Sequence, residues 1–164
     1  MTDEAHRRDA FEDDVRTALF RPTGELKRVQ FRLMGFAMGL SLLVLLAPTW
    51  LITRIESGRS GRIYSGMSLF GLTPGADSPM GALGTFLFLV YLLLALALLV
   101  VPTETPYALV AGIGGLVATF VIVVNQPEAR GSQVIDWSGA PAVALGIWLL
   151  AIVLAGVART TTRS

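Results

Sequence analysis

Four long stretches without a charged residue constrain this chain more than any other feature of its sequence. They cover Leu33–Thr53, Ser78–Thr103, Thr105–Pro127 and Trp137–Ala158, and contain 21, 26, 23 and 22 residues. A helix needs roughly 20 apolar residues to cross about 30 Å of hydrocarbon. The composition, 53% hydrophobic and 15% charged in 164 residues, is also typical of a membrane protein. The sequence therefore predicts an all-α membrane protein, folded as one four-transmembrane-helix bundle.

Start and stop signals set the predicted boundaries. Pro79 and Pro106 stand where the second and third spans begin, a position that tolerates proline because the first amides of a helix have no partner within it. Six basic residues flank the spans on the side of the termini and four on the loop side, so both termini are expected in the cytoplasm. The predicted spans are residues 33–53, 80–101, 106–125 and 141–158, with outer loops 54–79 and 126–140 and tails 1–32 and 159–164.

The first outer loop is the only sizeable polar segment between spans. Its centre, Gly58-Arg59-Ser60-Gly61, is rich in turn residues, so we expect a β-hairpin of two strands, Leu51–Ser57 and Arg62–Met67. Two strands alone are marginal in water, so the hairpin must rest on another part of the chain. An apolar cluster follows, and we expect it either to cap the bundle or to contact a partner; its members are Met67, Leu69, Phe70 and Leu72.

The N-terminal tail contains a second candidate contact surface. Phe11, Val15 and Leu19 fall on one face of a short predicted amphipathic helix, which Pro22 and Gly24 end. Two interpretations stay open at this point. The helix docks on a partner or on the membrane surface, or the segment is a solvated tail.

Small residues recur at a spacing of four in the spans. Such stripes let helices approach closely in lipid, where burial of apolar surface supplies no drive for association. We expect these stripes to pack inside the bundle: Gly35, Gly39, Ala108, Gly112, Ala111, Gly115, Ala142 and Gly146, with Ala151 and Ala155 continuing the last one.

The composition excludes several kinds of site. There is no cysteine, and the single histidine, His6, lies in the N-terminal tail, so no span supplies a thiolate or an imidazole ligand. No span contains Asp, Glu, Lys or Arg, the usual marks of proton and ion pathways in membranes. We expect no cofactor, no metal and, at a net charge of +1, no nucleic-acid partner.

Three hypotheses for function follow. The favoured one is a non-enzymatic accessory or scaffolding subunit, whose partners are the lipid bilayer and other membrane protein subunits or further copies of itself. The second is transport, through an oligomeric pore or by a carrier of small molecules or lipids, with a polar wall formed by Ser41, Thr85, Tyr91 and Thr119. The third, an enzyme of lipid or cell-wall metabolism, requires carboxylates to converge over an apolar groove; the candidates are Glu56, Asp77, Glu128 and Asp136.

The layout from Leu33 to Ala158 resembles that of the claudin-like tetraspan proteins. The resemblance implies cytoplasmic termini, a first outer loop with short strands, a short inner turn and a smaller second outer loop. No claudin binding residue is carried over, because residues 66–72 are GMSLFGL where the claudin signature has Gly-Leu-Trp and two cysteines. The chain is also similar to small tetraspan proteins of high-GC bacteria, in which the first span ends in Pro and Trp, here Pro48 and Trp50. This second resemblance implies a bacterial inner membrane.

Overall fold

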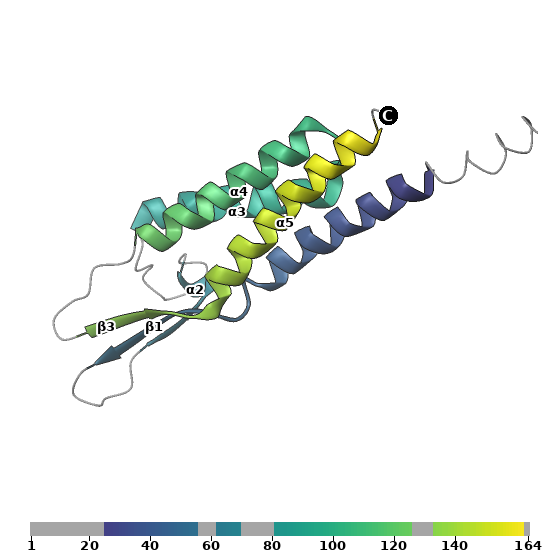
Figure 1. Cartoon of the computed structure of the whole chain (residues 1–164). Coiled ribbons are helices and arrows are strands. Elements are labelled where there is room, and N and C mark those ends of the chain that lie inside the picture. The colour runs from purple at the N-terminus through teal and green to yellow at the C-terminus, as the bar shows by residue number, and fades with distance from the viewer. Residues whose placement is uncertain (1–24, 56–61, 70–80, 126–132, 163–164) are drawn as a thin grey trace, which may run out of the picture.

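The computed structural model describes residues 25–55, 62–69, 81–125 and 133–162. In these residues a bundle of long helices carries a small antiparallel sheet at one end (Figure 1). We call this the sheet end. The opposite end, where the last described helix ends, is called the turn end, because residues 101–105 turn there between two helices. The predicted amphipathic helix around Phe11 and Val15 falls outside the described residues.

Three described helices have the length and apolar composition of membrane spans. The first two of these helices match the second and third predicted spans to within one residue at each end. Helix α3 covers Gly81–Val100, α4 covers Pro106–Val124 and α5 covers Gly139–Thr162. Helix α5 begins before the predicted fourth span and ends beyond it, so Arg159 of the expected tail is helical. Helix α4 packs against both α3 and α5.

The first helix corrects the predicted first span, which was expected to stay helical to Thr53. The described helix covers residues 25–44, and Thr49–Ile55 forms strand β1 instead. Pro48 explains the break, because proline has no N–H and disfavours the helical conformation of the residue before it, Ala47. The helical part of the charge-free run, residues 33–44, is about 18 Å long. That length is short of the roughly 30 Å of a hydrocarbon core. Beyond the helix, the run continues towards the sheet end as strand β1.

The sheet has three strands, and its central strand is β1. Strands β2, Ile63–Ser65, and β3, Gln133–Trp137, pair with β1 on its two sides, both antiparallel. The pairing of β1 with β2 confirms the predicted hairpin. Strand β3 corrects the prediction that residues 126–140 are only a loop, and α2, Gly66–Leu69, replaces the end of the second predicted strand.

The two faces of the sheet have different surroundings. Residues directly opposite on neighbouring strands share a face, and Tyr64, Leu51 and Trp137 form one such row, which packs on the core. Ile63, Ile52 and Asp136 form the next row, on the opposite face. Val134, two residues from Asp136, also lies there. We call this surface the outer sheet face: Ile52, Ile63, Val134 and Asp136.

Glycines bring the helices close together at four of the predicted packing positions. A Cβ on Gly35 would lie 2.5 Å from Cγ2 of Thr103, and one on Gly39 would lie 2.9 Å from the carbonyl oxygen of Ala95. The first helix therefore packs on α3 without room for side chains. The same holds between α4 and α5, where Gly112 meets Ile152 and Gly115 lies against the ring of Trp148. Ala108 and Ala111 on α4 are buried too.

Two residues of the predicted packing stripe on α5 lie on its exposed face and not in the bundle. Ala142 and Gly146 are exposed, and nothing lies within 4 Å of a Cβ built on Gly146. The buried stripe of α5 comprises Ala144, Trp148, Ala151, Ala155 and Ala158, so the second predicted pair, Ala151 and Ala155, does face the bundle. The prediction was wrong at the first pair because small residues occupy more than one face of this helix.

The contrast between Gly115 and Gly146 gives a matched test of the packing. A Cβ on Gly115 would lie 2.5 Å from Cδ2 of the fully buried Trp148, so Gly115→Ala should lower the free energy of unfolding by about 1–3 kcal/mol through overpacking. Gly146→Ala adds the same methyl group in open space and should be neutral or slightly stabilising, since alanine favours helix. Unfolding titrations in mixed micelles measure both, and equal effects would contradict this packing.

Candidate functional site

Two aromatic side chains cap the end of the first helix. Its last turns leave backbone carbonyls without partners, and the amide of Leu46 bonds to Leu43 rather than to Leu42. The hydroxyl of Tyr91 on α3 donates to the Leu42 carbonyl at 3.1 Å, and Nε1 of Trp50 on β1 donates to the Leu45 carbonyl at 2.7 Å. Both bonds satisfy carbonyls in a region where water is not a ready alternative.

The same two aromatic residues continue into a layer that joins the sheet to the bundle. Tyr91 lies edge-on to Trp50, with ring centroids 6.0 Å apart at 85°, and edge-on to Trp148 of α5, at 5.7 Å and 89°. All three are fully buried. We call these three residues the aromatic junction. Perpendicular aromatic pairs are favourable beyond the area that they bury, so the junction holds β1, α3 and α5 together.

Sequence reasoning did not identify the aromatic junction. It placed Trp50 at the end of the first span and Tyr91 in a polar wall. A signal was available, because a Trp or Tyr donor inside an apolar segment usually finds an acceptor. The carbonyl that accepts lies 49 residues away for Tyr91, and the sequence alone does not reveal that pairing.

Removal of one hydroxyl tests the cap. Tyr91→Phe keeps the ring but leaves the Leu42 carbonyl without its donor, so the free energy of unfolding should fall by about 0.5–1.5 kcal/mol. Tyr107→Phe is the control, because Tyr107 on α4 is 72% exposed and should tolerate the change. Unfolding titrations compare the two variants, and a fully stable Tyr91→Phe protein would contradict the capping role.

The four hydroxyl residues of the transport hypothesis do not form a common polar wall. Ser41, Thr85 and Thr119 each donate to a carbonyl one turn earlier in their own helix, at 2.8, 3.3 and 2.8 Å. Tyr91 donates to Leu42. Ser41 and Thr85 are exposed, whereas Tyr91 and Thr119 are buried. Each hydroxyl therefore donates to a backbone carbonyl, three of them within their own helix and Tyr91 to the first helix.

The carboxylates of the enzyme hypothesis fall mostly outside the described residues. Glu56, Asp77 and Glu128 lie there, and Asp136 is exposed on β3. Among the residues that the structure describes, no group of three or more His, Cys, Asp or Glu side chains is placed to hold a metal ion.

The expected apolar cluster after the hairpin divides into two parts. Met67 is 51% exposed, whereas Leu69 has no exposed surface and belongs to the core. The short helix α2 explains the difference, because residues two apart in a helix point in different directions. Leu69 is therefore not a contact residue for a partner. Phe70 and Leu72 lie outside the described residues.

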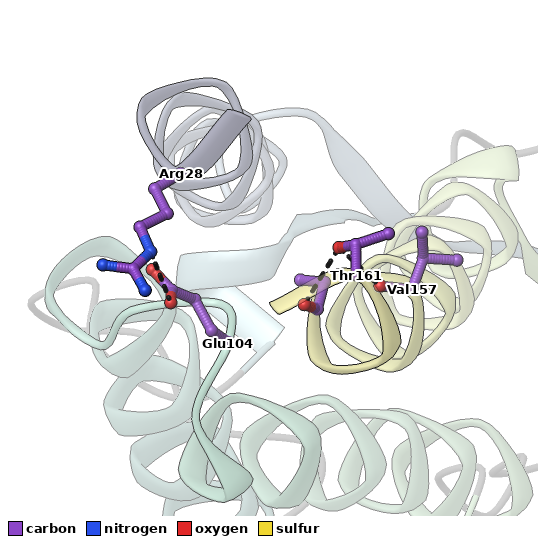
Figure 2. Close-up of polar contacts among 5 residues, drawn as sticks. Arg28, Glu104, Val157 and Thr161 are labelled. Atoms are coloured by element: carbon purple, nitrogen blue, oxygen red, sulfur yellow. Dashed lines mark hydrogen bonds and ion pairs between the residues drawn. The ribbon is translucent and has the colours of Figure 1, made fainter. Parts of the chain in front are cut away.

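Two surface pockets accompany these features. At the sheet end, an apolar groove of about 470 Å³ runs between the first helix and α5; its lining is Leu40, Ser41, Val44, Leu45, Pro48, Val143 and Ile147. At the turn end, a charged pocket of about 520 Å³ lies between the first helix and the turn from α3 to α4. We call it the turn-end pocket: Glu25, Arg28, Val29, Arg32, Pro102, Glu104 and Thr105. Figure 2 shows Arg28 reaching across it to Glu104, where their charged groups approach to 3.7 Å.

Comparison with known proteins adds no assignment to this geometry. No protein-family model, no curated protein and no solved structure matches the chain.

Proposed function

We propose that this chain is an accessory or scaffolding subunit of a bacterial inner-membrane complex, and that its outer sheet face binds another membrane protein. In this proposal the chain crosses the membrane four times, with the first crossing completed by β1, and both termini lie in the cytoplasm. The protein holds a partner in place and carries out no reaction of its own.

The outer sheet face is the observation that carries the proposal. Ile63 is 67% exposed and Val134 is 47% exposed, although the free face of an antiparallel sheet is usually polar. Contact with lipid does not explain these exposed apolar side chains. Asp136 is exposed on the same face, and a carboxylate is costly in hydrocarbon. Exposed apolar groups beside a charge are typical of a protein–protein contact.

The position of this face fits a contact outside the bundle. Strands β1 and β3 extend beyond the bundle at the end where α5 begins (Figure 1). Met67, in the short helix that follows β2, is also half exposed and adds apolar surface at the same end. In this position, the surface is accessible to a partner that is itself anchored in the same membrane.

The ends of the described chain support an even number of crossings. The start of the first helix and the end of α5 both lie at the turn end of the bundle (Figure 1). Basic residues gather there, with Lys27, Arg28 and Arg32 before the first apolar run and Arg159 in the last turns of α5. Under the positive-inside rule this is the cytoplasmic end.

The hydrogen bonds of the four hydroxyl residues favour a scaffold over a carrier. A carrier or pore offers unpaired polar groups to its cargo, whereas Ser41, Thr85, Tyr91 and Thr119 all donate to backbone carbonyls. The hydroxyl groups on which the transport hypothesis depended thus make hydrogen bonds within the folded protein.

A charge placed on the outer sheet face tests the proposal. Ile63→Asp should weaken association with the partner at least about tenfold, because an unpaired carboxylate would be buried in an apolar contact. The protein is purified from native membranes in mild detergent, and proteins bound in fixed ratio are quantified by mass spectrometry.

Two controls make that result specific. Ile63→Val keeps an apolar side chain and should retain the partner, and unfolding titrations establish that both variants fold. If Ile63→Asp and Val134→Asp each fold and retain every bound protein at the original ratio, the outer sheet face is not the contact.

A further inference from the structure

The turn-end pocket lies just beyond the end of helix α3, where a membrane-spanning helix would meet the lipid headgroups. Helix α3, with the length and composition of a membrane span, ends at Val100, and the pocket is lined by the turn that follows it and by the first helix just before its apolar run. Charged residues at such a boundary meet the polar part of the bilayer.

The pocket contains both signs of charge in equal number. Arg28 and Arg32 contribute two positive charges, and Glu25 and Glu104 contribute two negative ones. Arg28 and Glu104 already pair across the pocket, at 3.7 Å. Within the described residues, the side chains of Arg32 and Glu25 have neither an ion pair nor a hydrogen bond, so one cation and one anion remain available for a ligand.

Along the first helix, the positive charge of Arg32 lies nearer to the apolar run than the negative charge of Glu25. Arg32 stands next to Leu33, where the apolar run begins, whereas Glu25 lies two turns further from the membrane, about 10 Å along the helix axis. Val29 and Phe36 continue the same helical face on the membrane side of each charge, and they are 52% and 48% exposed. From the membrane outwards the face is therefore apolar, then positive, then negative.

We propose that the turn-end pocket binds a zwitterionic aminophospholipid of the phosphatidylethanolamine class. Its acyl chains lie along Phe36, its phosphate is bound by Arg32 with Arg28 beside it, and its ammonium group is bound by Glu25. Arginine suits the phosphate because the guanidinium donates two parallel hydrogen bonds. An anionic lipid without an amine leaves Glu25 unpaired, and a choline headgroup has no N–H to donate to it.

Competition between lipids tests this assignment. The full chain is placed in nanodiscs that contain phosphatidylethanolamine, phosphatidylglycerol and phosphatidylcholine with identical acyl chains in equal amounts, and retained lipids are identified by native mass spectrometry. We expect phosphatidylethanolamine to exceed each of the others about fivefold or more. Preferential retention of phosphatidylglycerol, or no preference among the three, would overturn the proposal.

Single substitutions test the phosphate contact and the ammonium contact of the headgroup separately. Arg32→Gln and Glu25→Gln should each reduce retention of phosphatidylethanolamine about fivefold to tenfold, since each removes one charge-assisted contact. Lys27→Gln is the matched control, because Lys27 is an exposed cation on the same helix that does not line the pocket, and it should have no effect. If Lys27→Gln reduced the retention of phosphatidylethanolamine equally, the binding would be a general attraction between basic residues and lipid, and the specific site would be refuted.

A charge exchange and a soluble competitor complete the test. The double variant Arg32→Glu with Glu25→Arg keeps the composition but reverses the order of charges, so it should lose the preference; a preference kept by this variant would refute the proposed orientation. Soluble O-phosphoethanolamine at millimolar concentration should leave the lipid in place. Its displacement of the lipid would assign the pocket to the free compound instead.

Discussion

The structure depends on the way the first helix ends inside the bundle. Leu42 is level with Tyr91, which lies ten residues, or about 15 Å, into α3 from Gly81. The Leu42 carbonyl thus lies against α3 in the buried interior, where an unpaired carbonyl would cost free energy. Tyr91 and Trp50 each satisfy one carbonyl at the end of the first helix. Because Trp50 lies on β1, its hydrogen bond also ties the start of the strand to the end of the helix.

A strand that starts beside a membrane bundle needs partners for its own backbone. The central position of β1, paired with β2 on one side and β3 on the other, removes both open edges of that strand. Ser138 adds a further link, since its amide donates to the Trp50 carbonyl and its hydroxyl to the Thr49 carbonyl. Strand β3 is therefore tied to the hairpin of β1 and β2, and the outer sheet face combines Ile63 from β2 with Val134 from β3.

Much of the helical part could be predicted because its signals are local. Helices α3 and α4 follow from charge-free runs with proline at or near the start of each. The end of the first helix could not be predicted from its charges, because the run from Leu33 to Thr53 continues without interruption and membrane helices tolerate proline. Strand β3 depends on a partner about 80 positions earlier in the chain, and only tertiary pairing selects it. On α5, Ala142 and Ala144 are equally small, and only the packing of Trp148 on Gly115 selects the buried face.

The central claim is that the first apolar run ends as strand β1, which pairs with strand β3. Ile52 and Asp136 are direct partners across β1 and β3, and opposite residues in antiparallel strands have Cα atoms about 4.5–5.5 Å apart, within reach of a disulfide. The chain has no cysteine of its own, so the variant Ile52→Cys with Asp136→Cys should oxidise to one internal disulfide, visible by mass and by gel mobility. The pair Ile52→Cys with Ile135→Cys, which lies on opposite faces, should not. Failure of the first pair to oxidise in a folded protein, or equal oxidation of both pairs, would contradict the account and favour a first span that stays helical to Thr53.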